Sequence, residues 1–152
     1  MKSNTVVILL VALLQIAYAS AVFAQQGMTW HGSGGWGHHS AYGMMYDTKT
    51  MTEITGEVVS VDRITMMHQM NEGIVLTVKT SEGNISVHLG PVWHLEKQDM
   101  KIMPGDKVVI KGSRIIFYDE PALIASEVHK GNDVLVLRDS EGYPVWSGWR
   151  RQ

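Results

Sequence analysis

From Met51 onward the sequence is a series of short runs rich in valine, isoleucine and threonine, and each run ends at residues that favour turns. The alternation is clearest where Ile85, Val87 and Leu89 fall on one face of an extended chain and polar residues fall on the other. Extended segments are predicted over residues 52–64, 74–80, 85–89, 107–113, 115–117, 122–129 and 134–137. A chain with this pattern is expected to fold as an all-β domain.

One short helix is predicted to interrupt these strands. Gly90 and Pro91 end the third strand, and Pro91 suits the first turn of a helix because its missing N–H has no partner there. Residues 92–100 are long enough for about two helical turns. The turn at residues 103–106 then leads into the next strand, so we expect a small barrel with one helix.

The order of these elements can be compared with known folds. The segments that matter are TGEVV at 55–59, LTVKT at 76–80, ISVHL at 85–89, PGDKVVIKG at 104–112 and ASEV at 125–128. Their succession resembles the OB-fold, a five-stranded barrel, and is similar to that of small exported bacterial OB-fold proteins of the envelope-stress and metal-stress type. The resemblance implies an OB-fold-like barrel of five to six strands over residues 51–138. It leaves the function open, because one fold serves many functions.

The first residues have the features of an export signal. Lys2 is followed by an apolar run from Val6 to Ala17, and small residues precede Ala24. We expect a signal peptide over residues 1–24, cleaved after Ala24, and a periplasmic or secreted protein without a transmembrane segment after cleavage. An uncleaved N-terminal anchor is the alternative.

The chain contains no cysteine, which excludes disulfides, thiolate chemistry and covalently attached haem of the c type. The domain must therefore be held together by its core alone. The formal net charge is −2, and loss of Lys2 with the signal peptide makes the remainder more acidic. Proteins that bind nucleic-acid backbones usually carry a basic excess, so this class is disfavoured.

Residues 25–50 differ from the rest of the chain because glycine and serine dominate and apolar periodicity is missing. This composition, rich in Gly, His, Met and Trp, predicts a flexible arm. His31, His38 and His39 could serve there as weak auxiliary ligands for Cu(II), Ni(II) or Zn(II). Alternatively, they are ordinary polar residues of a linker.

Met66, His68 and Met70 form the sharpest cluster of candidate metal ligands, in or beside the connection between the first two strands. If this segment is extended, the three side chains project from one side, with about 7 Å between successive Cα atoms. Two thioethers and one imidazole suit a soft ion, Cu(I) or Ag(I), and Met67 is an auxiliary candidate. The alternative is that these methionines only fill the barrel mouth, since Met often occupies irregular gaps.

The chemistry of this cluster is similar to that of the periplasmic copper and silver carriers, which are small OB-folds that bind metal through Met and His beside a Trp. In those carriers the Trp and two Met are close together and the His comes earlier, whereas here Trp93 lies well downstream. The resemblance implies that Trp93 covers the site if the fold brings it close, with His94 as a further auxiliary ligand. Ordinary solvent-facing histidines at positions 88 and 94 are the alternative.

The last segment, residues 139–152, contains Trp146, Trp149 and two arginines. Aromatic and cationic groups together suit a membrane interface or a partner protein. The same residues could instead dock back over one end of the barrel.

No motif of a nucleophile, a phosphate-binding loop or a catalytic zinc site is present, so we do not expect an enzyme. The leading hypothesis is an exported metal-handling protein for copper or silver. The second is a metal-independent OB-fold module that binds an envelope protein or a small ligand. The third, oligonucleotide binding, is disfavoured by export and net acidity.

Overall fold

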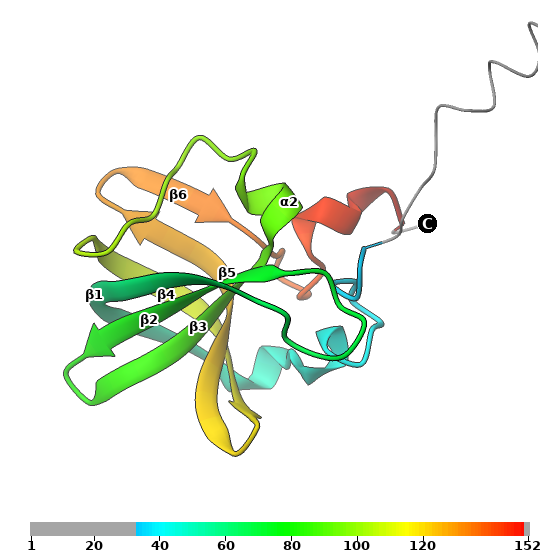
Figure 1. Ribbon diagram of the computed structural model, residues 1–152, viewed down its shortest axis with the longest axis horizontal. Coiled ribbons are helices and arrows are strands. Elements are labelled where there is room, and N and C mark those ends of the chain that lie inside the picture. The colour runs from blue at the N-terminus through cyan, green and yellow to red at the C-terminus, as the bar shows by residue number, and fades with distance from the viewer. Residues whose placement is uncertain (1–32, 151–152) are drawn as a thin grey trace, which may run out of the picture. The chain divides into compact units, whose positions relative to one another are not determined.

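The computed structural model describes residues 33–150, and it describes side chains as far as Ser147 (Figure 1). The expected signal peptide, the first residues of the expected arm with His31, and the side chain of Trp149 lie outside the described part. Within residues 33–150 no helix combines the length and the hydropathy needed to cross a membrane.

Six strands and one short α-helix make up most of the described chain. The strands are β1 (Met51–Ile64), β2 (Gly73–Thr80), β3 (Gly83–Pro91), β4 (Lys107–Phe117), β5 (Glu120–Lys130) and β6 (Asp133–Val136). The helix α2 (Val92–Leu95) follows β3, and the 3-10 helices η1 (Gly43–Met45), η2 (Thr48–Thr50) and η3 (Val145–Arg150) flank the strands. The predicted all-β class with one short helix is confirmed.

The strands form a sheet in the order β3-β2-β1-β4-β5-β6, and β3 also pairs with β5, so the sheet closes into a barrel-like ring (Figure 1). The closing contact is parallel and short, from Ser86–Ala122 to His88–Ile124, whereas the other pairings are antiparallel. A closed ring in which β1 lies between β2 and β4 is the expected OB-fold-like barrel.

The structure corrects the predicted element boundaries at two places. Residues 107–113 and 115–117 belong to one strand, because β4 pairs with β5 almost without interruption as far as Phe117. The helix is only four residues long, because the bonds from Lys97 N to His94 O and from Gln98 N to Leu95 O span three residues, as in a 3-10 turn.

Gly56 lies inside β1, but it is not the site of the irregularity in the pairing of this strand with β2. The irregularity in β1 lies between Val58 and Ser60. Gly56 is required instead by the close approach of β2, since a Cβ atom at this position would lie 2.3 Å from the carbonyl oxygen of Lys79.

Aliphatic side chains fill the interior of the ring. They are Ile54, Val58, Leu76, Val78, Ile85, Val87, Leu89, Val108, Ile110, Leu123, Ala125, Val128, Leu135 and Leu137. The predicted inward face of β3 is confirmed, because Val87 and Leu89 are fully buried here. Such burial of branched aliphatic surface is the main source of stability in a domain without disulfides.

A second buried cluster, which we call the aromatic–methionine cluster, lies on the outer side of the ring. It contains Trp36, Tyr42, Tyr46, Met66, Met70, Val75, Ile115, Ala122 and Ile124. His88 is also buried there, although the alternation in β3 had placed it on a solvent-facing side. The outer side of the ring is therefore covered at this cluster and is not exposed to solvent there.

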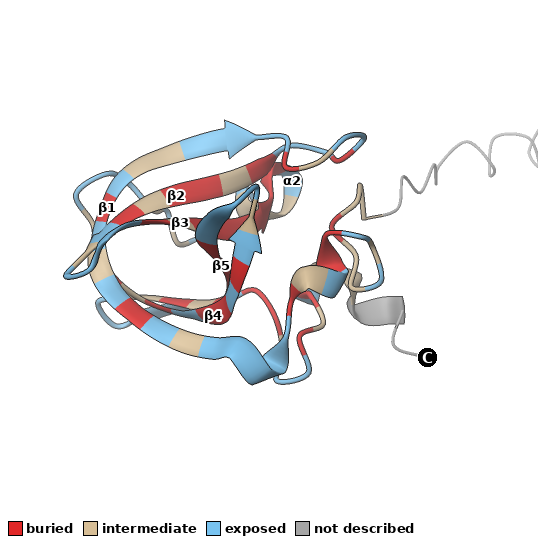
Figure 2. Ribbon diagram, turned by 90° about the horizontal axis from the view of Figure 1, so that it is seen from below, coloured by how far each residue is buried: buried red, intermediate tan, exposed pale blue. Residues whose placement is uncertain are grey.

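Residues 33–50 provide the aromatic part of this cluster, so the expectation of a flexible arm is wrong for this stretch. Trp36 and Tyr42 are essentially inaccessible to solvent, and the chain between them forms turns that lead into η1. Buried residues outside the strands are visible in Figure 2. The C-terminal η3 docks on the same cluster, because Trp146 Nε1 donates a hydrogen bond to the carbonyl oxygen of Trp36 at 3.0 Å.

Candidate functional site

The connection between β1 and β2 does not have the extended geometry on which the predicted metal site depended. Residues 65–72 form a loop, in which Met66 and Met70 are buried while His68 is exposed. Met66 packs in the aromatic–methionine cluster, so it behaves as the core-filling methionine of the alternative interpretation. The three donors therefore do not project from one side of a strand, and this part of the prediction is wrong.

The loop does contain a tight turn that groups other donors. The backbone N–H of Met70 donates to the carbonyl oxygen of Met67 at 3.1 Å, and Gln69 has a φ of 65°. A positive φ is unusual for a residue with a side chain, so this turn must be held by its surroundings. Met67, His68 and Met70 are therefore three of the four residues of one turn, and Gln69 is the other.

The segment before η1 holds this turn in place. Trp36 Nε1 donates to the carbonyl oxygen of Asn71 at 2.9 Å, and Asn71 N donates to the carbonyl oxygen of Gly34 at 2.9 Å. Gly35 lies so close to the loop that a Cβ atom there would come within 2.5 Å of Met70 Cγ. The side chain of Met70 is therefore positioned by packing, whereas His68 is exposed and free to adjust.

A hollow of about 260 Å³ lies between the turn and residues 35–42. Its lining residues are uncharged or imidazole-bearing: Gly35, Ser40, Ala41, Tyr42, Met67, His68, Gln69 and Met70. The Ser40 hydroxyl is already engaged, since it donates to Gly37 O at 2.7 Å and accepts from Gly43 N at 2.9 Å. The donors left at the hollow are two thioethers, one imidazole and the amide of Gln69.

Tyr42, at the base of this hollow, takes part in a buried hydrogen bond. Its hydroxyl lies 2.9 Å from His88 Nδ1. Burial raises the pKa of Tyr42 and lowers the pKa of His88 to about 4, so both groups are neutral at pH 7. The edge of His88 also faces Phe117 at 5.0 Å between ring centroids. This hydroxyl is thus a fixed structural group and not a phenolate ligand.

Arg138 is a further buried polar residue, and sequence reasoning missed it. Its guanidinium lies 5.1 Å from the ring centroid of Tyr46 and 5.5 Å from that of Trp146, and Nη1 donates to Gly142 O at 3.1 Å. Nε and Nη2 have no hydrogen-bond partner among the described residues. Burial lowers the pKa of this guanidinium. Arg138 therefore holds the C-terminal segment to the cluster by cation–π contacts.

The auxiliary candidates His38 and His39 are not among the residues that line the hollow. His38 stacks on Tyr143 with 3.9 Å between ring centroids, and His39 lies 4.9 Å from His38. Within residues 33–150 no three or more His, Asp or Glu side chains are grouped so that they could hold a metal ion. His38 and His39 are therefore a pair without a third such ligand in the described part of the chain.

Trp93 and His94 belong to α2 and are not among the residues that line the hollow. His94 instead faces Trp146 at 5.2 Å between ring centroids. Its pKa is lowered mainly by burial and to a smaller extent by the positive charge of Lys97. Trp93 is 37 % exposed. The expectation that these two residues cover or extend the metal site is not supported.

Comparison with known proteins gives a family. The model of the MamS/MamX magnetosome protein family matches residues 50–135, which is more than half of the chain. The match includes the six strands almost to their end and the loop with Met67, His68 and Met70, while Arg138 and Trp146 lie beyond it. The description of the matched family names neither an OB-fold nor a copper carrier, so those two resemblances stay predictions. A search of the curated proteins finds no match. The chain belongs to the MamS/MamX magnetosome protein family.

Proposed function

We propose that this protein is a non-catalytic metal-handling protein of the bacterial cell envelope, that it acts in association with the magnetosome, and that it binds one soft monovalent ion at Met67, His68 and Met70. The association is supported by the family, and the envelope location by the export signal expected over residues 1–24. The observation that carries the metal proposal is the hollow that these three residues line. Met67 replaces Met66 in the ligand set, because Met67 lines the hollow and Met66 does not.

The chemistry of the hollow favours a soft ion. Thioether and imidazole ligands suit Cu(I) and Ag(I), while Mg²⁺, Ca²⁺ and Mn²⁺ prefer carboxylate and carbonyl oxygens. Among the described residues, no carboxylate lines the hollow, and the hydroxyl oxygens of Ser40 and Tyr42 are engaged in hydrogen bonds. Three neutral ligands leave the full charge of the ion uncompensated. This favours a monovalent ion over a divalent one, because a buried net charge is costly.

The site combines one fixed ligand with two that can adjust. Met70 is packed against Gly35, while Met67 is half-buried and His68 is exposed. Thioether side chains are flexible, so Met67 can move onto an ion that reaches the hollow from solvent. An ion bound in this way stays accessible to exchange, as a handling protein requires.

The proposal is tested by titrating the purified protein with Ag(I), a redox-inert probe for Cu(I), against a competing chelator. We expect one tight site, and we expect its affinity to fall at least tenfold in His68→Ala and in Met67→Leu. Met44→Leu is the matched control, because Met44 is a solvent-exposed methionine outside the hollow. Equal affinities in the wild-type protein, Met67→Leu and His68→Ala would refute the site.

The competing function is a metal-independent module that docks an envelope protein. It predicts that a partner is retained from an envelope extract equally well with and without chelator, and that Met67→Leu leaves this retention unchanged. The metal proposal instead predicts that chelator changes partner retention by the wild-type protein and does not change retention by the Met67→Leu variant.

A further inference from the structure

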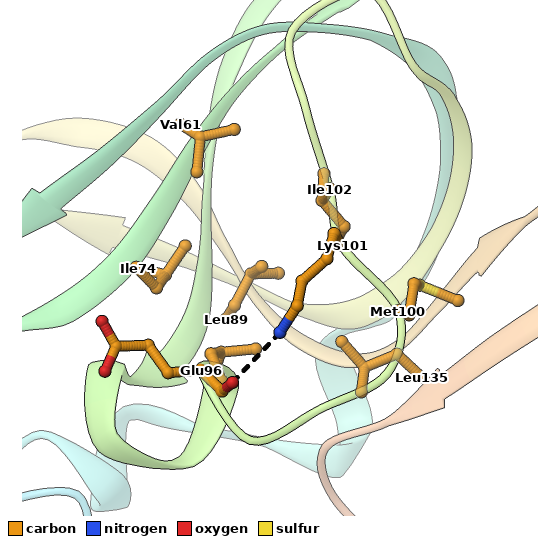
Figure 3. A pocket seen from close by; sticks show the side chains of 9 residues that line it. Val61, Ile74, Leu89, Glu96, Met100, Lys101, Ile102 and Leu135 are labelled. Atoms are coloured by element: carbon orange, nitrogen blue, oxygen red, sulfur yellow. Dashed lines mark hydrogen bonds between the residues drawn. The ribbon is translucent and has the colours of Figure 1, made fainter.

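An apolar pocket of about 320 Å³ opens at one end of the barrel, beside α2 (Figure 3). Side chains from three strands, the helix, the following connection and β6 surround it. They include Val61, Ile74, Leu89, Leu95, Ile102 and Leu135. The pocket shares no lining residue with the hollow at Met67, His68 and Met70, so it is a separate site.

The pocket exists because the end of the barrel is covered by little regular structure. The helix α2 has only four residues, and residues 96–106 continue as an irregular connection (Figure 1). As a result, Val61, Ile74 and Ile102 are only partly buried, although they pack against the aliphatic core. Covering apolar surface that is in contact with water lowers the free energy, so a ligand that covers this surface is stabilised by the hydrophobic effect.

One cation lies at the rim of this pocket. The side chain of Lys101 reaches across the opening toward the helix in Figure 3, and its Nζ donates to Glu96 O at 3.0 Å and to Gln98 O at 2.6 Å. An ammonium group has three N–H donors, so one remains available.

The carboxylate among the residues that line the pocket is engaged elsewhere. Glu96 forms its ion pair with Arg63. Among the described residues, no ion pair includes Lys101. The pocket therefore joins an apolar interior to a positive charge that has a free donor and no carboxylate partner in the part of the chain that the structure describes.

We propose that this pocket binds a single-chain apolar anion, such as a medium-chain carboxylate, with the chain among the aliphatic side chains and the anionic group at Lys101. Ligand pockets of this kind are mostly apolar, with a few polar groups that fix orientation, and their volumes begin at roughly 300 Å³. The volume therefore suits one chain better than a bulky ring system or a lipid with two chains. This inference is independent of the metal site.

The test compares ligands that have the same chain and different head groups. Decanoate, decanol and decyltrimethylammonium are titrated separately into the purified protein by calorimetry. We expect decanoate to bind at least tenfold more tightly than the cationic ligand, with decanol between them. Equal affinity for decanoate and decyltrimethylammonium, or no decanoate binding, would overturn the proposal.

Two pairs of variants locate the site. Lys101→Gln should remove the preference for decanoate over decanol, and Lys97→Gln should not, because Lys97 is exposed on the same connection but does not line the pocket. Ile102→Trp should fill the pocket and lower decanoate affinity at least tenfold, whereas Ile116→Trp on the exposed part of β4 should leave it unchanged.

Because Lys101 also bonds two backbone carbonyls, Lys101→Arg is included to keep the charge if the connection loosens in Lys101→Gln. Retained preference in Lys101→Arg supports a role for charge. Unchanged preference in a folded Lys101→Gln protein contradicts it. Affinity for an acidic peptide with an aliphatic side chain, and none for decanoate, would assign the pocket to a protein partner instead and would overturn the inference.

Discussion

The interior of the barrel and the aromatic–methionine cluster are both buried, yet they are built from different materials. The interior is aliphatic and comes from regularly alternating strands within the family match. The cluster combines aromatic rings, methionine sulfur and the polar groups of His88 and Arg138, and much of it comes from residues 33–50 and 138–146. Side chains with polar atoms and exposed edges provide chemistry that branched aliphatics cannot. We therefore place the proposed metal site at the edge of the cluster.

This comparison also implies that the cluster is a full part of the folded domain. Long-range hydrogen bonds tie it together: Trp36 contacts Asn71 through its indole N–H and Trp146 through its backbone carbonyl. If these contacts are as firm as those of the interior, a deletion in either region has a similar cost. Substitutions in the two regions measure these costs, and the largest effect is expected at Trp36.

Trp36→Ala is expected to lower the free energy of unfolding by about 3–5 kcal/mol, because it removes a fully buried ring and its hydrogen bond to Asn71. Leu76→Ala, in the interior, should cost about 2–5 kcal/mol. Urea denaturation of both variants measures the two values side by side. A cost for Trp36→Ala below about 1 kcal/mol would show that residues 33–50 are only loosely attached.

His88 should make the stability of the cluster depend on pH. Its pKa is about 4 in the folded protein and 6.5 ordinarily, so between these values the unfolded chain takes up a proton that the folded chain refuses. The stabilisation is fully present above pH 6.5 and is lost as pH falls toward 4, by about 3 kcal/mol.

Urea denaturation between pH 7 and pH 4 measures this loss, and His88→Gln is the matched variant. Its profile should be flatter than that of the wild-type protein, because the substituted side chain does not titrate. Identical profiles for the two proteins would mean that His88 accepts a proton without penalty, contrary to its burial.

Arg138→Met should have the smallest effect and the opposite sign. A buried guanidinium whose Nε and Nη2 lack hydrogen-bond partners among the described residues carries a desolvation cost, which cation–π contacts with Tyr46 and Trp146 only partly offset. We expect the variant to be more stable by about 1 kcal/mol in thermal or urea denaturation. A loss of more than about 2 kcal/mol would instead indicate that the charge is needed in the native cluster.

Much of the barrel could be predicted from sequence, because alternation reports which side of a strand faces a core. Val87 and Leu89 illustrate this, and so does the error at His88, since alternation cannot distinguish solvent from a second core. The barrel needs only local periodicity and turn residues, which are written into short stretches of chain.

The cluster could not be predicted in the same way. Trp36 and Tyr42 have no periodic neighbours, and the partners that bury Trp36 are distant in sequence, as its contacts with Asn71 and Trp146 show. The candidate metal ligands were chosen from the sequence by residue type, and the segment that carries them was assumed to be extended. The turn at Met67–Met70 reverses which methionine faces the hollow, and a spacing rule contains no information on that.

The most direct test of the proposed metal site is an NMR titration of the protein, carrying isotope-labelled methionine methyl groups, with Ag(I). The methyl signals of Met67 and Met70, assigned through Met67→Leu and Met70→Leu, should shift together up to one equivalent, along with the ring signals of His68. Met66 should move much less, because it does not line the hollow. Saturable shifts confined to other methionines or to His38 and His39, with Met67 and Met70 unmoved, would contradict the site.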